Sequence, residues 1–182
     1  MKNNNLPRGA CALSLFLFIA LFFGTLESAH AALIFEPPPN NNFFSFNSPP
    51  DDDSELDVHD LINRERRRRR LPDLVWDDRL ADLARDYSRR MARENFFAHY
   101  DSNGRNIIAR ASFARIKNWS KIGENLFYCE GMSDYTAASV RGWMRSPAHK
   151  QNILDRDWTT TGIGIARARD GRIYVTQVFI KK

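Results

Sequence analysis

The chain has 182 residues, of which 43% are hydrophobic and 27% are charged, and a formal net charge of +5. This length allows one domain together with short terminal extensions. Residues 57–182 hold 25 of the 27 basic and 16 of the 22 acidic residues, so the net charge of this part is +9. Such a surface suits an anionic envelope surface, phospholipid or another polyanion as partner. Nucleic acid is not an expected partner, because the N-terminal sequence is typical of an exported chain.

The first 31 residues have the three parts of a secretory signal peptide. Lys2 and Arg8 precede an apolar run over residues 10–24, and Ala29-His30-Ala31 is an A-x-A cleavage sequence. The apolar run is shorter than a membrane-spanning helix requires. We therefore expect cleavage after Ala31 and a secreted location, extracellular or periplasmic, with an uncleaved anchor as the alternative. Cleavage would leave Cys129 as the remaining cysteine, which excludes an intramolecular disulfide.

Residues 32–56 are predicted to form a linker rich in Pro, Asn and Asp. It contains the runs Pro37-Pro38-Pro39, Asn40-Asn41-Asn42 and Asp51-Asp52-Asp53. This composition does not support a packed core and is typical of a stiff, solvated tether. Three aromatic residues are the exception and are candidates for docking on the domain or on a partner: Phe43, Phe44 and Phe46. The folded domain is predicted over residues 57–182.

Apolar residues at helical spacing predict the helices of the domain. We expect helices over residues 57–70, 78–95, 107–116, 134–145 and 147–154. The second has its apolar stripe at Leu80, Leu83, Ala84, Tyr87 and Met91. The first ends in five consecutive arginines, Arg66 to Arg70. We interpret these arginines as solvated cations at a helix C-terminus, in preference to a nucleic-acid site.

The last 23 residues have the pattern of β-strands. Two strands, over residues 160–166 and 173–180, are joined by Arg169-Asp170-Gly171-Arg172, and Asp-Gly favours a hairpin. Residues 74–76 and 125–128 are candidates for two further strands. A small antiparallel sheet with helices packed on both faces would bury the apolar sides of all these elements. The predicted fold class is α+β, a three-layer α-β-α sandwich with a small antiparallel sheet between helices.

Four short segments in the second half combine ionisable with apolar residues. They are Phe97-Ala98-His99, Gly123-Glu124-Asn125-Leu126, Ser146-Pro147-Ala148-His149 with the following residues 152–154, and residues 174–179. Imidazole and carboxylate bind divalent metals or transfer protons near neutral pH. Burial of a carboxylate without a partner is costly, so His99, Glu124 and His149 are candidate site residues. A single histidine of this kind is more often a structural group than a ligand, and sequence alone does not bring the three together.

The order, spacing and neighbours of these segments resemble the CAP superfamily (cysteine-rich secretory proteins, antigen 5, pathogenesis-related 1), whose domain is also called the SCP domain. The similarity is to the bacterial, disulfide-poor branch. It runs from Leu61-Ile62-Asn63-Arg64-Glu65-Arg66, through residues 71–77, to Gln177-Val178-Phe179. The resemblance implies the same α-β-α sandwich. It also implies a central cleft lined by the F-x-H histidine and the G-E-N-L glutamate, which are His99 and Glu124 here.

The bacterial branch adds the histidine of its S-P-x-H segment, which His149 matches. Disulfide-rich relatives instead carry a histidine where Tyr174 stands and a second glutamate where Ser146 stands. Two of the four groups of that version are therefore replaced, and its metal chemistry does not transfer directly. Tyr174 and Ser146 remain candidates for lining the cleft. Two amides, Asn125 and Gln177, are candidate hydrogen-bonding residues beside it.

His99, Glu124 and His149 together would be a familiar ligand set for zinc or another divalent metal, with a position left open. A metal held there could activate water for hydrolysis. The three lack the short H-E-x-x-H spacing of recognisable zinc enzymes. Without a metal, Glu124 would orient His99 within a hydrogen-bond network. Ser146 and Cys129 are present as nucleophiles, but nothing in the sequence activates either one.

Two classes of function remain. The first is a secreted, non-enzymatic CAP-domain protein whose His- and Glu-lined cleft binds a small ligand, a lipid or a divalent metal at the cell envelope or outside the cell. The second is a metal-assisted, peptidase-like hydrolase that acts on an envelope peptide or polymer. The resemblance favours the first, because the fold is shared widely without an agreed chemistry.

Overall fold

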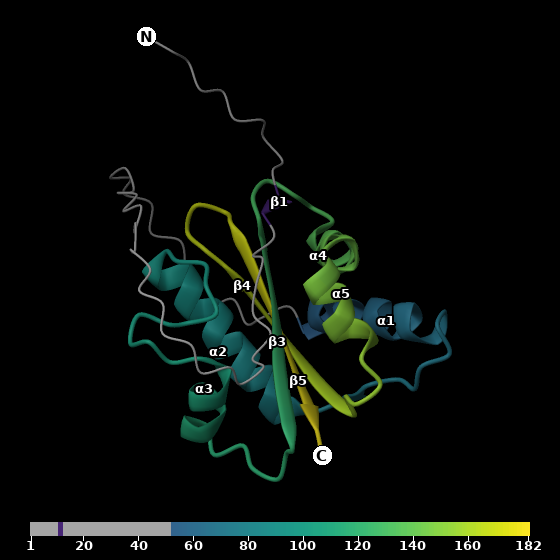
Figure 1. Ribbon diagram of the computed structural model, residues 1–182. Helices are drawn as coiled ribbons and strands as arrows, with labels where there is room; N and C mark the ends of the chain where they lie inside the picture. Colours follow the sequence, from purple (N-terminus) through teal and green to yellow (C-terminus); the bar gives the residue numbers. More distant parts are fainter. Residues whose placement is uncertain (1–10, 13–51) are drawn as a thin grey trace.

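The computed structural model describes residues 11–12 and 52–182, with side chains from residue 53 onward. The predicted linker before residue 52, with its phenylalanines, and all of the predicted signal peptide except Cys11–Ala12 lie outside the described residues. The elements in chain order are β1 (Cys11–Ala12), α1 (Asp52–Arg67), β2 (Val75–Trp76), α2 (Asp78–Glu94), α3 (Ile107–Phe113), β3 (Lys121–Cys129), α4 (Tyr135–Arg145), α5 (Pro147–Leu154), β4 (Thr160–Arg167) and β5 (Ile173–Lys181) (Figure 1). No helix in the described parts of the chain has the length and apolar character needed to cross a membrane.

The strands form one sheet in the order β1-β3-β5-β4-β2. β5 lies between β3 and β4 and is antiparallel to both, so the predicted hairpin forms its centre. The prediction of a purely antiparallel sheet is wrong at one edge, because β2 runs parallel to β4, with Val75 beside Thr160. Parallel neighbours need a long crossover connection, and here α2 to α5 lie between the two strands in sequence. The sheet is therefore mixed, and the predicted α+β class is confirmed.

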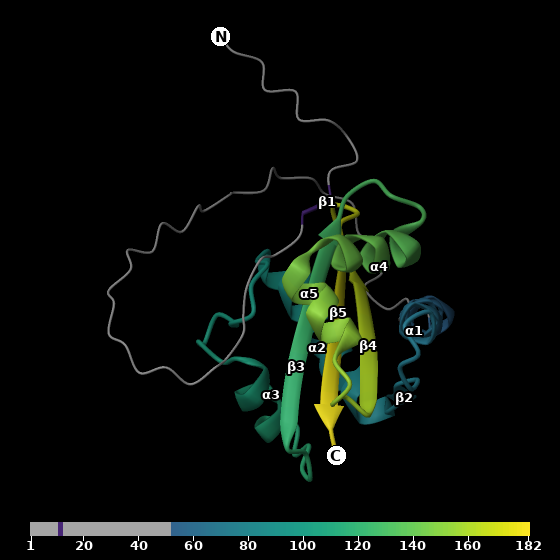
Figure 2. The same ribbon diagram turned by 45° about the vertical axis from the view of Figure 1, so that its right-hand side comes forward.

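Helices cover both faces of the sheet, as predicted. Figures 1 and 2 show α2 and α3 on one face and α1, α4 and α5 on the other. Successive residues of a strand point to opposite faces, and β5 follows this rule. Val178 packs with Leu80 of α2, whereas Phe179 belongs to the cluster around Trp143 of α4. The sheet is therefore buried on both sides and fixes where each helix lies.

The apolar stripe predicted for α2 is buried as expected. The helix begins at the N-cap Asp77, whose carboxylate accepts hydrogen bonds from the backbone of Arg79 and Leu80 at 3.0 and 3.3 Å. α2 lies directly on the backbone of β4. A Cβ added to Gly164 would lie 2.0 Å from the backbone nitrogen of Arg85, which no side chain tolerates. This close approach holds the middle of α2 against the sheet.

α1 begins at Asp52, five residues earlier than the helix predicted from residue 57, so residues 52–56 belong to α1 and not to the linker. This turn is acidic in composition, which suggests a solvated segment, but one of its carboxylates is buried. The Glu55 side chain is 0% exposed and accepts a hydrogen bond from Nε of Arg85 at 2.7 Å. Its other oxygen accepts from the backbone N–H of Ile165 at 2.9 Å. In the described residues, β2 pairs with β4 only at residues 160 and 161, and Glu55 satisfies one N–H of the strand edge beyond that point, that of Ile165.

The interpretation of the five arginines as solvated is wrong for Arg66, which is 0% exposed. Its guanidinium donates to the carbonyl oxygens of Pro72, Ile153 and Asp155 at 2.7 to 2.9 Å. Burial lowers the pKa of Arg66, against the opposing charge of Asp155. Arg66 therefore ties the end of α1 to the end of α5, and it helps to fix the position of α5 on the sheet.

Candidate functional site

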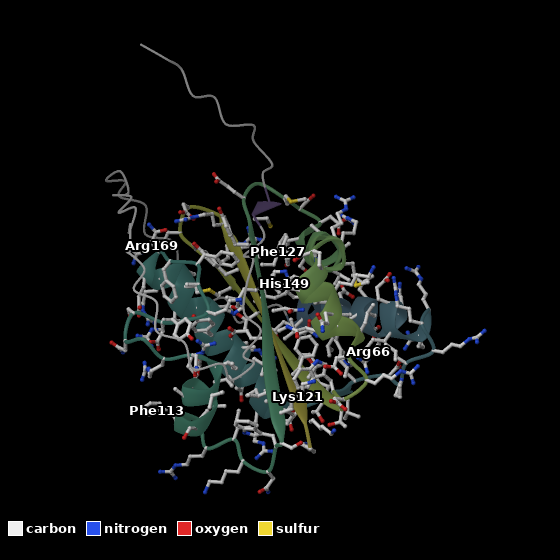
Figure 3. All side chains as sticks on the ribbon, viewed as in Figure 1. Arg66, Phe113, Lys121, Phe127, His149 and Arg169 are labelled. Atoms are coloured by element: carbon white, nitrogen blue, oxygen red, sulfur yellow. The ribbon has the colours of Figure 1, made fainter. Side chains whose placement is uncertain are left out.

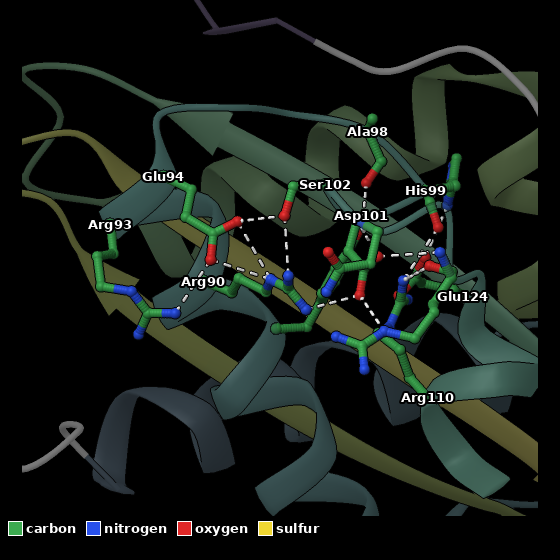
Figure 4. Close-up of polar contacts among 12 residues, drawn as sticks. Arg90, Arg93, Glu94, Ala98, His99, Asp101, Ser102, Arg110 and Glu124 are labelled. Atoms are coloured by element: carbon green, nitrogen blue, oxygen red, sulfur yellow. Dashed lines mark hydrogen bonds and ion pairs between the residues drawn. The ribbon is translucent and has the colours of Figure 1, made fainter. Parts of the chain in front are cut away.

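His99 and Glu124, the two residues singled out by the F-x-H and G-E-N-L segments, are hydrogen-bonded to each other. Nδ1 of His99 lies 2.8 Å from Oε1 of Glu124 (Figure 4). A carboxylate accepts only, so the imidazole donates through Nδ1 and its Nε2 is left for another partner. The second oxygen of Glu124 accepts a hydrogen bond from Arg110. The side chains of His99, Glu124 and Arg110 are 13%, 2% and 7% exposed, so this is a buried ion pair with an imidazole attached.

The loop that carries His99 is fixed by groups on α2 and α3. The Tyr87 hydroxyl of α2 donates to the carbonyl oxygen of Ala98 at 2.5 Å, and Arg110 of α3 donates to the carbonyl oxygen of His99 at 3.0 Å. The guanidinium of Arg110 also lies 3.3 Å from the centre of the Tyr87 ring. Burial raises the pKa of Tyr87, so its hydroxyl keeps its proton and remains a donor. His99 is therefore held at its backbone and at its ring.

Arg110 was not among the residues that the sequence singled out for the site. The helical spacing of this segment indicates that Arg110 is buried. Ile107, Arg110 and Ala111 lie on one face of a helical turn, and all three are buried. An arginine on the apolar face of a helix requires a buried acceptor. Glu124 is that acceptor, and only the packing of α3 against β3 brings the two together.

The turn after His99 is held by a second acidic residue. Asp101 is 5% exposed and accepts from Arg90 at 2.7 Å and from Arg105 at 2.8 Å (Figure 4). It also accepts from the backbone nitrogens of Asn103 and Arg105. Burial acts to raise the pKa of Asp101, but these hydrogen bonds and the charge of Arg90 lower it overall. The turn over residues 101–104 is therefore a support for the segment that presents His99.

His149 lies on α5, on the other side of β3 (Figure 3). The residue is 3% exposed, and its ring atom Nδ1 has no hydrogen-bond partner. Burial, and then the interaction with His99, lowers the pKa of His149 to about 4. This imidazole is therefore neutral at pH 7.

Two asparagines fasten α5 to β3 beside Glu124. Nδ2 of Asn125 donates to the carbonyl oxygen of His149 at 3.2 Å, and Nδ2 of Asn152 donates to Oδ1 of Asn125 at 2.9 Å. Asn125 is 0% exposed and follows Glu124 directly, so its side chain points to the opposite face of the strand. One strand thus carries Glu124 toward α3 and Asn125 toward α5.

The other predicted cleft residues are buried in two different surroundings. Tyr174 is 1% exposed and stacks on Tyr128 with ring centres 6.0 Å apart, in an aromatic cluster that includes Phe97, and burial raises its pKa. Gln177 donates from Nε2 to Thr161 at 3.2 Å, and its Oε1 has no partner. Ser146 is 5% exposed and its hydroxyl oxygen also has no partner.

The predicted three-ligand metal set does not fit this arrangement. Both carboxylate oxygens of Glu124 already have partners, one in His99 and one in Arg110. A cation on Glu124 would have to displace a buried guanidinium, and Nδ1 of His99 is used in the same network. In the described parts of the chain, no three His, Cys, Asp or Glu side chains are grouped so as to hold a metal ion. The arrangement can instead present fixed imidazole nitrogens to a bound molecule.

Comparison with known proteins gives a consistent assignment. The sequence profile of the CAP family, described as the cysteine-rich secretory protein family, matches residues 59–179. Two proteins of Bacillus subtilis strain 168 are similar: "Uncharacterized membrane protein YlbC" is 31% identical over 131 residues, and "Uncharacterized protein YkwD" is 32% identical over 129 residues. These stretches cover 71% and 70% of the present chain but only 35% and 47% of the two relatives. The chain belongs to the CAP family.

Solved structures agree on the fold. An extracellular protein with an SCP domain from Bacillus anthracis strain Ames is 28% identical, with a TM-score of 0.61 over 72% of this chain and 41% of its own. An outer surface protein of Borrelia burgdorferi is 20% identical, with a TM-score of 0.64 over 71% of this chain and 93% of its own. The predicted membership of the CAP superfamily, in its bacterial branch, is confirmed.

Proposed function

We propose that this chain is an exported CAP-domain module that binds a small, uncharged polar molecule, or a lipid head group of that kind, beside His99 and His149. The observation that carries the proposal is the neutral, buried His149, whose Nδ1 lacks a partner. A binding function agrees with a site in which the imidazole of His99 is fixed before a ligand arrives.

The charge of the cluster supports an uncharged ligand. The carboxylate of Glu124 is paired with the guanidinium of Arg110, and His149 is neutral at pH 7. The cluster therefore carries no unpaired ionised partner for a charged ligand. A buried polar atom without a hydrogen bond costs about 1–3 kcal/mol. Nδ1 of His149 is closed to solvent, so a ligand must displace the side chains that cover it. A ligand hydroxyl or amide that then bonds to Nδ1 would recover this cost, which favours ligands that carry such groups.

A metal-assisted hydrolase is the second class that the sequence allows, and no feature of the site favours it. Arg110 takes the Glu124 oxygen that a metal would use. Binding of zinc or another divalent metal stays a prediction, and metal analysis of protein purified without added zinc tests it. Metal in a 1:1 ratio that is lost in His99→Ala would restore the hydrolase proposal.

Histidine ¹⁵N resonances give a direct test of the binding proposal. Titration with a panel of uncharged hydroxyl and amide compounds, N-acetylglucosamine among them, should shift the Nδ1 signal of His149 in a saturable way. His149→Phe, which keeps a ring of similar size, should abolish binding while the domain stays folded. His59 lies on α1 with its Nε2 2.9 Å from the Leu74 carbonyl, and it serves as the control histidine that should not shift.

Two results would contradict the binding proposal. The first is that no compound of the panel shifts His149. The second is that His99→Ala and His149→Phe both lower the free energy of unfolding as much as a core Leu→Ala change, about 2–5 kcal/mol. In that case the two histidines are structural groups of the fold.

Export forms the other half of the proposal. The charged start, the apolar run and Ala29-His30-Ala31 support it, and the similar solved structures include an extracellular protein. The exported chain should begin near Ala32. The intact mass of protein recovered outside the cytoplasm decides this, and a mass that retains residues 1–31 would replace the signal peptide with an anchor.

A further inference from the structure

The turn that follows His99 contains the dipeptide Asn103-Gly104, the only Asn-Gly pair in the sequence. Both residues are exposed. Gly104 has a φ of +73°, and a Cβ added there would meet no described atom within 4 Å apart from its chain neighbours. Glycine has no side chain that could shield its backbone nitrogen. No side chain of residue 104 therefore stands between this nitrogen and the side-chain amide of Asn103.

Two guanidinium groups face the side-chain oxygen of Asn103. These donors orient the amide, so that its oxygen accepts hydrogen bonds from Nη2 of Arg90 and from Nη2 of Arg105, each at 3.1 Å. The two arginine side chains are only 18% and 31% exposed. Both also pair with Asp101, at 2.7 and 2.8 Å, and Figure 4 shows the pair that Arg90 makes. Two fixed cations therefore lie at hydrogen-bond distance from one neutral carbonyl oxygen.

Fixed donors at this distance stabilise negative charge that develops on a carbonyl oxygen, as in an oxyanion hole. Such charge develops on the side-chain oxygen of an asparagine when the next backbone nitrogen attacks its amide carbon. We propose that Asn103 is a deamidation site. The backbone nitrogen of Gly104 attacks Cγ of Asn103, and Arg90 and Arg105 stabilise the oxygen during the attack.

The reaction consumes one water molecule and releases ammonia. The Gly104 nitrogen loses its proton to a base in the solvent and forms a bond to Cγ of Asn103. The bond from Cγ to the side-chain nitrogen breaks, and this nitrogen takes up a proton and leaves as ammonia, so that a cyclic imide remains. Water then opens the imide. Attack at Cγ gives aspartate, and attack at the backbone carbonyl carbon gives isoaspartate, in which Cβ has become part of the main chain.

One hydrogen bond opposes the reaction. The backbone N–H of Gly104 donates to the carbonyl oxygen of Asp101 at 2.8 Å, so the nitrogen must leave this bond before it attacks. Exposed turns of this kind open locally at little cost. Asn118 provides a comparison within the same chain, because it is also exposed but precedes Trp119. The bulky side chain of Trp119 hinders attack by its backbone nitrogen, which Gly104 does not.

The product changes the support of the segment that carries His99. An aspartate carboxylate at residue 103 would compete with Asp101 for the guanidinium groups of Arg90 and Arg105. Isoaspartate would also lengthen the main chain of the turn, where the backbone nitrogens of residues 103 and 105 donate to Asp101. Deamidation would therefore loosen this turn as the protein ages. This inference does not depend on a ligand beside the histidines, and it can hold or fail without one.

Peptide mapping by mass spectrometry tests the proposal. The full chain is kept folded in a mildly alkaline buffer for several weeks, and each asparagine is followed by the mass increase that accompanies replacement of an amide by an acid. Conversion at Asn103 should be at least tenfold faster than at Asn118. Conversion at Asn103 that is no faster than at Asn118 would overturn the proposal.

The variant Arg105→Gln tests the role of the guanidinium groups. Loss of a donor to the amide oxygen should slow conversion of Asn103 at least threefold in the folded protein. Loss of a merely structural contact would instead speed it, because a looser turn would release the N–H of Gly104 more easily. In urea, where the fold is absent, the variant and the wild-type protein should react within twofold of each other.

A matched control removes a neighbouring cation that does not contact Asn103. Arg93 of α2 is exposed and pairs with Glu94 at 3.1 Å. Arg93→Gln should keep the rate at Asn103 within twofold of wild type in the folded protein. Equal slowing in Arg93→Gln and Arg105→Gln would mean that general charge controls the rate, and the proposed role of the two guanidinium groups would be wrong. An unchanged or faster rate in Arg105→Gln would also refute it.

Discussion

Two buried polar clusters lie on opposite faces of β3, and they are built differently. On the α3 side, the ionised groups of Glu124 and Arg110 are paired and bonded to His99. On the α5 side, the groups are neutral, and unpartnered atoms remain on Ser146, His149 and Gln177. Charges cannot be buried without a partner, whereas a neutral polar atom costs less. Folding therefore pairs both charges of the first cluster, where Nε of Arg110 is left without a partner, and leaves three neutral atoms without partners in the second. The neutral side is thus where binding of a molecule gains most.

The largest test of this contrast removes the charged acceptor. Glu124→Gln leaves Arg110, whose side chain is 7% exposed, without its carboxylate. Loss of one partner of a buried ion pair costs about 3–5 kcal/mol. Urea unfolding should show a loss of this size, and Glu124→Gln/Arg110→Met should recover most of it. As the control, Glu65→Gln breaks pairs with exposed Arg68 and Arg69 and should cost less than about 1 kcal/mol.

A loss of less than about 1 kcal/mol in Glu124→Gln, the size typical of an exposed pair, would show that the charged cluster does not depend on its ion pair. The charged cluster on the α3 side of β3 would then not differ from the neutral cluster in the way described above.

The next test uses pH and addresses the neutral side. Burial and the interaction with His99 lower the native pKa of His149 from 6.5 to about 4. As the pH falls, the unfolded chain takes up this proton first. The stabilisation is thus complete above pH 6.5 and is lost between pH 6.5 and 4, by about 3 kcal/mol in total.

The pH dependence is measured from urea unfolding at about pH 7, 5.5 and 4.5, which span the window between the two pKa values. Other groups also titrate in this range, so the quantity of interest is the difference between the wild-type protein and His149→Phe. The variant should be less sensitive to acid than the wild type. Equal slopes in the two proteins would mean that His149 is accessible to protons in the native state, contrary to its burial.

The smallest test compares two buried serines. The Ser88 hydroxyl donates to the carbonyl oxygen of Gly164 and lies 2.8 Å from Oγ1 of Thr176. Ser88→Ala should therefore cost about 1–3 kcal/mol, because an acceptor loses its donor. Ser146→Ala removes a buried hydroxyl without partners and should leave the free energy of unfolding unchanged or raise it. A cost above about 1 kcal/mol for Ser146→Ala would show that this hydroxyl is bonded in solution.

The spacing of apolar residues in the sequence was sufficient to predict the helices and strands that bury one face. The stripe of α2 and the hairpin of β4 and β5 follow from spacing and from Asp170-Gly171, because a helix or strand must bury one face whatever covers it. The pairing of His99 with Glu124 was indicated only by family resemblance. The partners of buried charges were not predictable. Glu55 occurs in a segment that looks solvated, and Arg110 occurs on the apolar face of a helix, but the partners of both lie elsewhere in the sequence.

Glu55 has a consequence for how the domain behaves in a crowded solution. An uncovered strand edge is a template for another chain, and natural proteins block such edges with charge or cover. The carboxylate of Glu55 blocks the edge of β4 by occupying the N–H of Ile165. A truncation at residue 57, where composition alone would place the domain start, removes this block and also leaves Arg85 without its buried partner. Such a fragment should associate through the exposed edges of its sheet. Protection against aggregation therefore depends on residues 52–56, whose composition predicts a linker.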